Sequence, residues 1–148
     1  MASELFSGHE ITIFDGAIGT ELYGRGFYIN RPFEELNLSA PGEVLGVHKD
    51  YINAGAQVLT TNTFSITRPQ LANFDIAHQQ GALLEAALKL ANEAAHGSHA
   101  KIAFSMGPLG VLLEPLGPTS VLEASDEFAH TASVAIAKGN FDLYVLET

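Results

Sequence analysis

Two carboxylate residues follow apolar segments near opposite ends of the chain. Asp15 comes directly after residues 11–14, and Glu147 comes directly after residues 141–146. Each apolar segment has the length of a short strand, so each carboxylate is expected at the carboxyl end of a strand. Parallel α/β folds bind their ligands at that edge of the sheet. We therefore expect Asp15 and Glu147 to contribute to one binding site.

The chemistry of such a site suggests its ligand. Two carboxylates at one edge repel each other unless a cation joins them, and a substrate ammonium group would serve. Backbone N–H groups of Gly16, Ala17 and Ile18 could hold an anionic carboxylate. An α-amino acid carries both charges. A purely structural interpretation also remains open, in which Asp15 caps a turn and Glu147 is a solvated strand end.

A third polar residue, Asn62, follows the apolar segment 57–61. Its amide could orient a ligand, or it could satisfy loop amides in a strand-end turn, and the residue pattern slightly favours the turn. The glycines at 16 and 19 match neither common phosphate-binding motif, so they are interpreted as tight-turn residues. His96 and His99 lack a carboxylate at ligand spacing and are interpreted as loop residues.

Four short apolar segments predict the strands that position these residues: 11–14, 57–61, 101–106 and 141–146. Their near-continuous apolar character is typical of parallel strands covered by helices. Amphipathic patterns predict helices between them: one from Pro41 to about Gly55, one over about 79–95, and one from an N-cap at Ser125 to Lys138, with Ile136 facing inward. The sequence predicts an α/β fold of parallel βα repeats.

The composition of the chain excludes several classes of partner and of metal site. The 148 residues include 17 acidic and 7 basic side chains, a net charge of −10, so we expect neither nucleic acid nor an anionic membrane as a partner. The chain has no cysteine, which excludes disulfides and thiolate-bound zinc within it. No signal-like or membrane-spanning segment is evident, so a cytoplasmic location is expected. The length predicts a single folding unit over residues 1–148.

Several short motifs together resemble the homocysteine S-methyltransferase family, which includes the homocysteine-binding module of cobalamin-dependent methionine synthase and the betaine and S-methylmethionine enzymes. The motifs run in order through nearly the whole chain. They are Phe14-Asp15-Gly16-Ala17-Ile18-Gly19-Thr20-Glu21-Leu22, Asn37-Leu38, Val47-His48, Tyr51, Ala54-Gly55-Ala56, Thr61-Asn62-Thr63-Phe64, Gly107-Pro108 and Glu147-Thr148.

The resemblance implies a (β/α)₈ TIM-type barrel in which homocysteine binds with its thiolate on zinc and attacks a methyl group to give methionine. It implies that Asp15 and Glu147 bind the substrate amino group and that the amides of Gly16 and Ala17 receive its carboxylate. It further implies that three consecutive residues line the pocket, namely Asn62, Thr63 and Phe64. The methyl donor stays open among betaine, S-methylmethionine and methylcobalamin charged from methylfolate.

The sequence departs from the family at its metal site. The family's zinc is held by later cysteines, and this chain has none. A full barrel takes roughly 250 residues, so the four predicted strands correspond to the N-terminal half of a barrel, through truncation or a split gene. The first hypothesis is therefore a substrate-binding half-barrel, inactive alone, that pairs with a missing C-terminal half. The alternative is a non-catalytic half-barrel or flavodoxin-like binding or assembly module that self-associates through exposed strand edges.

Overall fold

The core of the protein is a parallel sheet of three strands. The computed structural model describes residues 11–28 and 30–148. In it, β1 (Val58–Thr60), β2 (Lys101–Met106) and β3 (Leu143–Leu146) lie in the order β1-β2-β3. Both pairings are parallel, with Thr60 opposite Ala103 and Ser105 opposite Val145. The prediction of a parallel α/β fold is confirmed.

The first predicted strand, residues 11–14, is reduced to one bridge. Phe14 pairs in parallel with Val58, and this isolated bridge lies outside the named strands. The Ile13 amide donates to Oε1 of the Gln57 side chain at 2.9 Å instead of to a backbone carbonyl. Because a side chain takes the place of the next backbone partner, the ladder does not extend into a strand. Within the described residues the sheet thus has three strands and not the predicted four.

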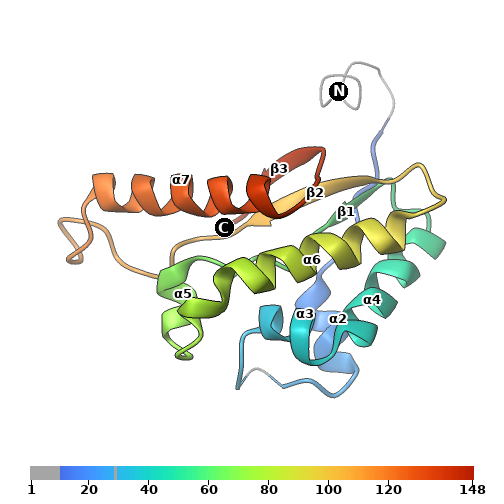
Figure 1. The fold of residues 1–148 in the computed structure, drawn as a ribbon, viewed down its shortest axis with the longest axis horizontal. Helices are drawn as coiled ribbons and strands as arrows, with labels where there is room; N and C mark the ends of the chain where they lie inside the picture. The colour runs from blue at the N-terminus through green and yellow to red at the C-terminus, as the bar shows by residue number, and fades with distance from the viewer. Residues whose placement is uncertain (1–10, 29) are drawn as a thin grey trace.

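The three long helices lie side by side in the order of the chain. In Figure 1, α6 (Gln80–Ala95) runs between α4 (Pro41–Asn53) and α7 (Val121–Lys138), in front of the strands. None of the helices in the described residues is long and apolar enough to cross a membrane. The helices, with two short 3-10 turns, are α2 (Ile18–Gly24), η1 (Phe33–Glu35), α3 (Leu36–Ser39), α4 (Pro41–Asn53), α5 (Arg68–Ala72), η2 (Ala77–Gln79), α6 (Gln80–Ala95) and α7 (Val121–Lys138).

The main hydrophobic cluster joins α6, β2 and α7. Leu84 and Leu88 of α6 pack with Phe104 of β2 and Ala135 of α7, all fully or almost fully buried. The predicted inward position of Ile136 is wrong, because its side chain is 65% exposed. The buried face of α7 runs through Glu127, Thr131 and Ala135, and Ile136 lies off this face.

The N-cap of α7 lies five residues before the predicted one. Ser120, not Ser125, is the N-cap, and it forms a capping box with Glu123. The Glu123 amide donates to Ser120 Oγ at 3.2 Å, and the Ser120 amide donates to Glu123 Oε2 at 2.8 Å. These bonds satisfy amides at the helix start that have no partner inside the helix, which explains the earlier start.

We expect Ser120→Ala to lower the free energy of unfolding by about 1 kcal/mol, because it removes the capping acceptor. Ser125→Ala, on an exposed position of the same helix, is the matched control and should change stability by less than about 0.5 kcal/mol. Urea unfolding followed by circular dichroism measures both. Equal losses in the two variants would contradict the assigned cap.

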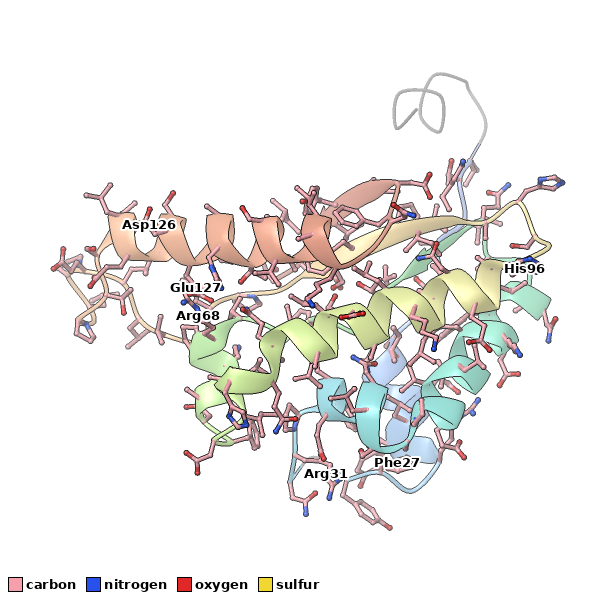
Figure 2. All side chains as sticks on the ribbon, in the orientation of Figure 1. Phe27, Arg31, Arg68, His96, Asp126 and Glu127 are labelled. Atoms are coloured by element: carbon pink, nitrogen blue, oxygen red, sulfur yellow. The ribbon has the colours of Figure 1, made fainter. Side chains whose placement is uncertain are left out.

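An ion pair joins α5 to α7. Arg68 and Glu127 point toward each other from the two helices (Figure 2), with Arg68 Nε 2.7 Å from Glu127 Oε2 and the Arg68 amide 2.9 Å from Oε1. Glu127 is 8% exposed, so several donors compensate its buried charge. The pair holds the segment that follows β1 against α7.

Candidate functional site

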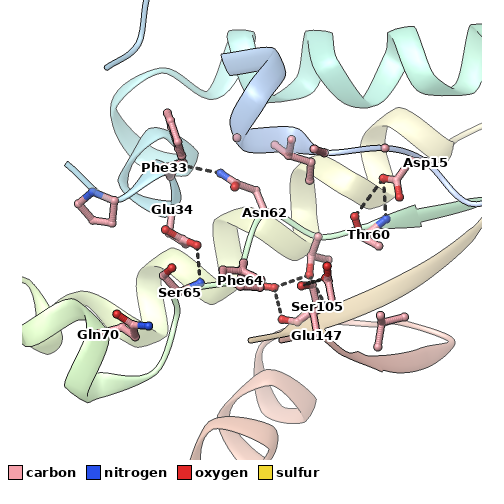
Figure 3. A pocket seen from close by; sticks show the side chains of 18 of the residues that line it. Asp15, Phe33, Glu34, Thr60, Asn62, Phe64, Ser65, Gln70, Ser105 and Glu147 are labelled. Carbon is pink, nitrogen blue, oxygen red and sulfur yellow. Dashed lines mark hydrogen bonds between the residues drawn. The ribbon is translucent and has the colours of Figure 1, made fainter. Parts of the chain in front are cut away.

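A cavity of about 770 Å³ opens where the strands end (Figure 3). All seven residues predicted for the substrate site line it: Asp15, Gly16, Ala17, Asn62, Thr63, Phe64 and Glu147. Thr60 and Ser105 also contribute to the wall. The bridge at Phe14 and the parallel register bring these residues together from segments far apart in the sequence.

Asp15 is held by β1 through one oxygen only. Its Oδ2 accepts hydrogen bonds from the Thr60 amide at 2.8 Å and from Thr60 Oγ1 at 3.2 Å. Its Oδ1 is buried and has no hydrogen-bond partner among the described residues. A buried carboxylate oxygen without a donor is costly, so this atom is suited to accept a hydrogen bond from a ligand.

Burial raises the pKa of Asp15 to about 6. The hydrogen bonds from Thr60 oppose this effect, and the nearby charge of Glu147 adds a small further rise in the pKa of Asp15. An ammonium group bound at Oδ1 would stabilise the ionised form. The site therefore favours a cationic ligand group near neutral pH.

Glu147 is fixed from the neighbouring strand. Ser105 Oγ of β2 donates a short hydrogen bond to Glu147 Oε1. The backbone continues the pairing, because the Glu147 amide donates to the Met106 carbonyl at 3.0 Å. The Ser105 hydroxyl thus orients this second carboxylate, and the sequence offers no pattern that assigns Ser105 this role.

The turn after Asp15 needs glycine because an aromatic side chain covers it. A Cβ atom on Gly16 would lie 2.7 Å from the Tyr51 hydroxyl oxygen. That hydroxyl donates to the Ala17 carbonyl at 3.1 Å and so fixes the turn from α4. The amides of Gly16 and Ala17 have no hydrogen-bond partner in the part of the chain that the structure describes. Both are available to an anionic ligand group.

Asn62 is a structural residue of the wall. Its Nδ2 donates to the Phe33 carbonyl at 2.8 Å and to Asn37 Oδ1 at 3.0 Å. Asn37 Nδ2 returns a hydrogen bond to the Asn62 carbonyl at 2.9 Å. Both amide hydrogens of Asn62 are therefore committed within the protein, to a carbonyl oxygen and a side-chain oxygen instead of the loop amides of the turn interpretation. Thr63 is fully buried and donates to the Ser105 carbonyl at 2.7 Å, so it too supports the wall.

A third carboxylate, which sequence reasoning missed, lines the cavity. Glu34, in η1, is 3% exposed, and its Oε1 accepts a hydrogen bond from the Ser65 amide at 2.6 Å. Burial raises the pKa of Glu34, and the Ser65 amide opposes this. No spacing signal identifies Glu34, because it is the fold of residues 31–39 that turns it toward the segment after β1.

The sequence model of the homocysteine S-methyltransferase family matches residues 12–148. The chain belongs to this family. It is 30% identical to the methionine synthases of Mycobacterium leprae and Mycobacterium tuberculosis, over 93% of its own length and 12% of theirs. It superposes on the homocysteine methyltransferase MmuM from Escherichia coli, in its metallated form, with a TM-score of 0.80 and 25% identity. That match covers 97% of this chain and 56% of MmuM, so this family member spans about half the length of its solved relative.

The residues of this homocysteine S-methyltransferase family member do not fit the zinc site that the resemblance implies. The sequence has no cysteine, and the described residues contain no group of three or more His, Cys, Asp or Glu side chains that could hold a metal ion. Any cysteine ligands of zinc in a complete site would have to come from outside this sequence.

Proposed function

We propose that this chain is the homocysteine-binding part of a homocysteine S-methyltransferase, and that it forms the N-terminal half of a (β/α)₈ barrel. In this role it binds homocysteine for transfer of a methyl group to sulfur, which gives methionine. The family membership and the likeness to MmuM support the reaction class. The arrangement of charges in the cavity supports the substrate.

The observation that carries the proposal is the unpartnered Oδ1 of Asp15, which lines the same cavity as Glu147. An ammonium group has three donors and can satisfy both carboxylates at once. The free amides of Gly16 and Ala17 lie beside Asp15 in the chain and would donate hydrogen bonds to the substrate carboxylate. An α-amino acid held by these two groups leaves its side chain, with the sulfur, directed into the remaining cavity.

The chain's contribution to the reaction is to bind and orient the substrate. Its residues neutralise the amino and carboxylate groups, so that the thiol is the one reactive group left free. Because the chain supplies no cysteine ligands for zinc, we propose that it binds homocysteine without catalysing methyl transfer by itself. Zinc-dependent formation of methionine by the purified chain would overturn this part of the proposal.

Calorimetric titration with homocysteine and with 4-mercaptobutanoate tests the binding role. The second compound keeps the thiol and the carboxylate and lacks the amino group. We expect it to bind at least about 30-fold more weakly, because the two carboxylates then lose their cation. Equal affinities, or no binding of homocysteine, would contradict the proposed substrate.

An assembly role is also proposed, because β3 is an edge strand with exposed apolar side chains. Leu146 is 78% exposed and Tyr144 is 41% exposed, and Ile136 of α7 is similarly open. Unpaired edges of this kind associate with another strand, either a C-terminal half-barrel or a second copy. Light scattering on the purified chain measures this, and a monodisperse monomer at all concentrations would exclude the second copy.

A further inference from the structure

Tyr51 contacts the turn after Asp15 from outside the cavity. It lies on α4 and is not one of the residues that line the cavity, yet its hydroxyl donates to the Ala17 carbonyl at 3.1 Å. Ala17 is the N-cap of α2, and its side chain has no oxygen with which to cap the helix. The turn at residues 16–17 therefore depends on a contact from another element.

The same hydroxyl lies against Gly16. A Cβ atom on Gly16 would lie 2.7 Å from the Tyr51 hydroxyl oxygen and 3.1 Å from Cε1 of its ring. The φ angle of Gly16 lies outside the left-handed region, so the closeness of the ring, and not the backbone conformation, requires glycine here. Tyr51 thus contacts both residues whose amides are free to bind an anionic group.

The surroundings of Tyr51 keep its hydroxyl a hydrogen-bond donor. Partial burial raises the pKa of Tyr51, and the negative charges of Glu21 and Asp15 add to that rise in pKa. The protonated hydroxyl has one hydrogen, and it is donated to the Ala17 carbonyl. Because the peptide group is planar, a fixed carbonyl also fixes the orientation of the backbone at the end of the turn.

The other end of α2 is anchored to α4 independently, and the two helices pack together. Arg25 is the C-cap of α2 and forms ion pairs with Glu43 at 3.4 Å and Asp50 at 2.6 Å. Gly46 of α4 leaves room for this side chain, because a Cβ atom there would lie 2.6 Å from Arg25 Nη1. The helix therefore stays attached to α4 when the Tyr51 hydroxyl is removed, and only the turn at residues 16–17 is released.

We propose that Tyr51 is a positioning residue that holds the turn at residues 16–17 in the geometry that binds the α-carboxylate of the substrate. The identity of that carboxylate rests on the proposed function. Tyr51 acts through the Ala17 peptide group, because the place of this group decides whether the amides of Gly16 and Ala17 converge on one anion. The amino end of the substrate is held by Asp15 and Glu147 and does not depend on Tyr51.

Two ligands separate the two ends of the substrate. Homocysteine carries both charged groups, and 3-aminopropane-1-thiol keeps the thiol and the amino group but lacks the carboxylate. In Tyr51→Phe, we expect homocysteine affinity to fall at least about 5-fold and 3-aminopropane-1-thiol affinity to stay within about 2-fold of the parent. Calorimetric titration measures both. A hydroxyl that served only the stability of the fold would change the two affinities alike.

Two further variants locate the effect. Tyr144→Phe removes a hydroxyl from a partly exposed residue outside the cavity wall, so it is the matched control and should leave both affinities unchanged. Gly16→Ala adds a Cβ atom that displaces the Tyr51 hydroxyl, and it should reproduce the selective loss if Tyr51→Phe does not fold. The double variant should lose no more than about 2-fold beyond the weaker single variant, since both changes break one hydrogen bond.

The outcomes separate this inference from the proposed function. Homocysteine affinity within about 2-fold of the parent in Tyr51→Phe would overturn the inference and leave the proposed function standing. Equal losses for the two ligands, or the same selective loss in Tyr144→Phe, would also overturn it. Equal affinities of the parent chain for the two ligands would show that the turn binds no carboxylate. A parent chain that binds neither ligand would contradict the proposed function and, with it, the role of Tyr51.

Discussion

The Asp15→Asn variant is expected to bind homocysteine at least about 30-fold more weakly than the parent chain. The substitution keeps an oxygen that can accept from the Thr60 amide, so the local fold should persist. The asparagine side chain is neutral, and its NH₂ group, a hydrogen-bond donor, takes the place of Oδ1, which now has no partner. The substrate ammonium group then loses the more buried of its two carboxylate partners. Glu147→Gln is expected to weaken binding for the same reason, while leaving Asp15 in place.

The pH dependence of binding gives a second readout for Asp15. Burial raises its pKa to about 6, so the carboxyl group is protonated as the pH falls below that value. Only the ionised form attracts the ammonium group, and we expect the parent's affinity to fall about tenfold between pH 7 and pH 5. Calorimetry over this range should show that Asp15→Asn loses most of the dependence. Glu21→Gln, an exposed acid on α2 outside the cavity wall, is the matched control. An affinity within about 3-fold of the parent in Asp15→Asn would contradict the assigned role.

The His48→Leu variant is expected to gain stability relative to the parent chain as the pH falls from 7 into the acid range. His48 of α4 is fully buried, and neither ring nitrogen has a hydrogen-bond partner among the described residues. Burial lowers the pKa of His48 to about 4, from an ordinary value of 6.5. The unfolded chain therefore binds a proton below pH 6.5 that the folded chain accepts only near pH 4. The stability that His48 contributes is present above pH 6.5 and is lost as the pH falls toward 4.

The size of the effect follows from the two pKa values. We expect the stability difference between His48→Leu and the parent to shift by about 1 kcal/mol from pH 7 to pH 5.5, and by about 3 kcal/mol at pH 4. Asp15 acts in the opposite direction, because its raised pKa makes the folded chain take up a proton first. Asp15 is present in both proteins, so its contribution cancels in the difference.

Urea unfolding at each pH measures this difference. His130→Leu, on the exposed side of α7, is the matched control and should follow the parent's profile. A leucine in this buried position leaves no ring nitrogen without a partner, so the variant should fold. A constant difference between His48→Leu and the parent across the pH range would show that His48 is solvated or paired in the folded protein.

The sequence determined the fold class and most of the members of the site. Apolar segments and helical periodicity depend on residues close in the chain, so α6 and the parallel strands β2 and β3 were predictable. The residues after those segments, Asp15 and Glu147, could be assigned to one edge because parallel strands end together. Nothing tests their substrate roles yet, and these stay predictions.

The tertiary structure alone decided how each site residue is used. The side chains of Asn62 and Thr63 form hydrogen bonds with other residues of the cavity wall. Their partners, Asn37 and Ser105, are distant in sequence, so local patterns do not identify these bonds. The first predicted strand is reduced to one bridge because the Gln57 side chain, and not a backbone carbonyl, accepts the hydrogen bond from the Ile13 amide. Glu34 reaches the cavity only through the path of residues 31–39. Periodicity and motifs report local preferences, whereas the partner of each polar atom depends on which distant segments pack together, and only the folded chain fixes that.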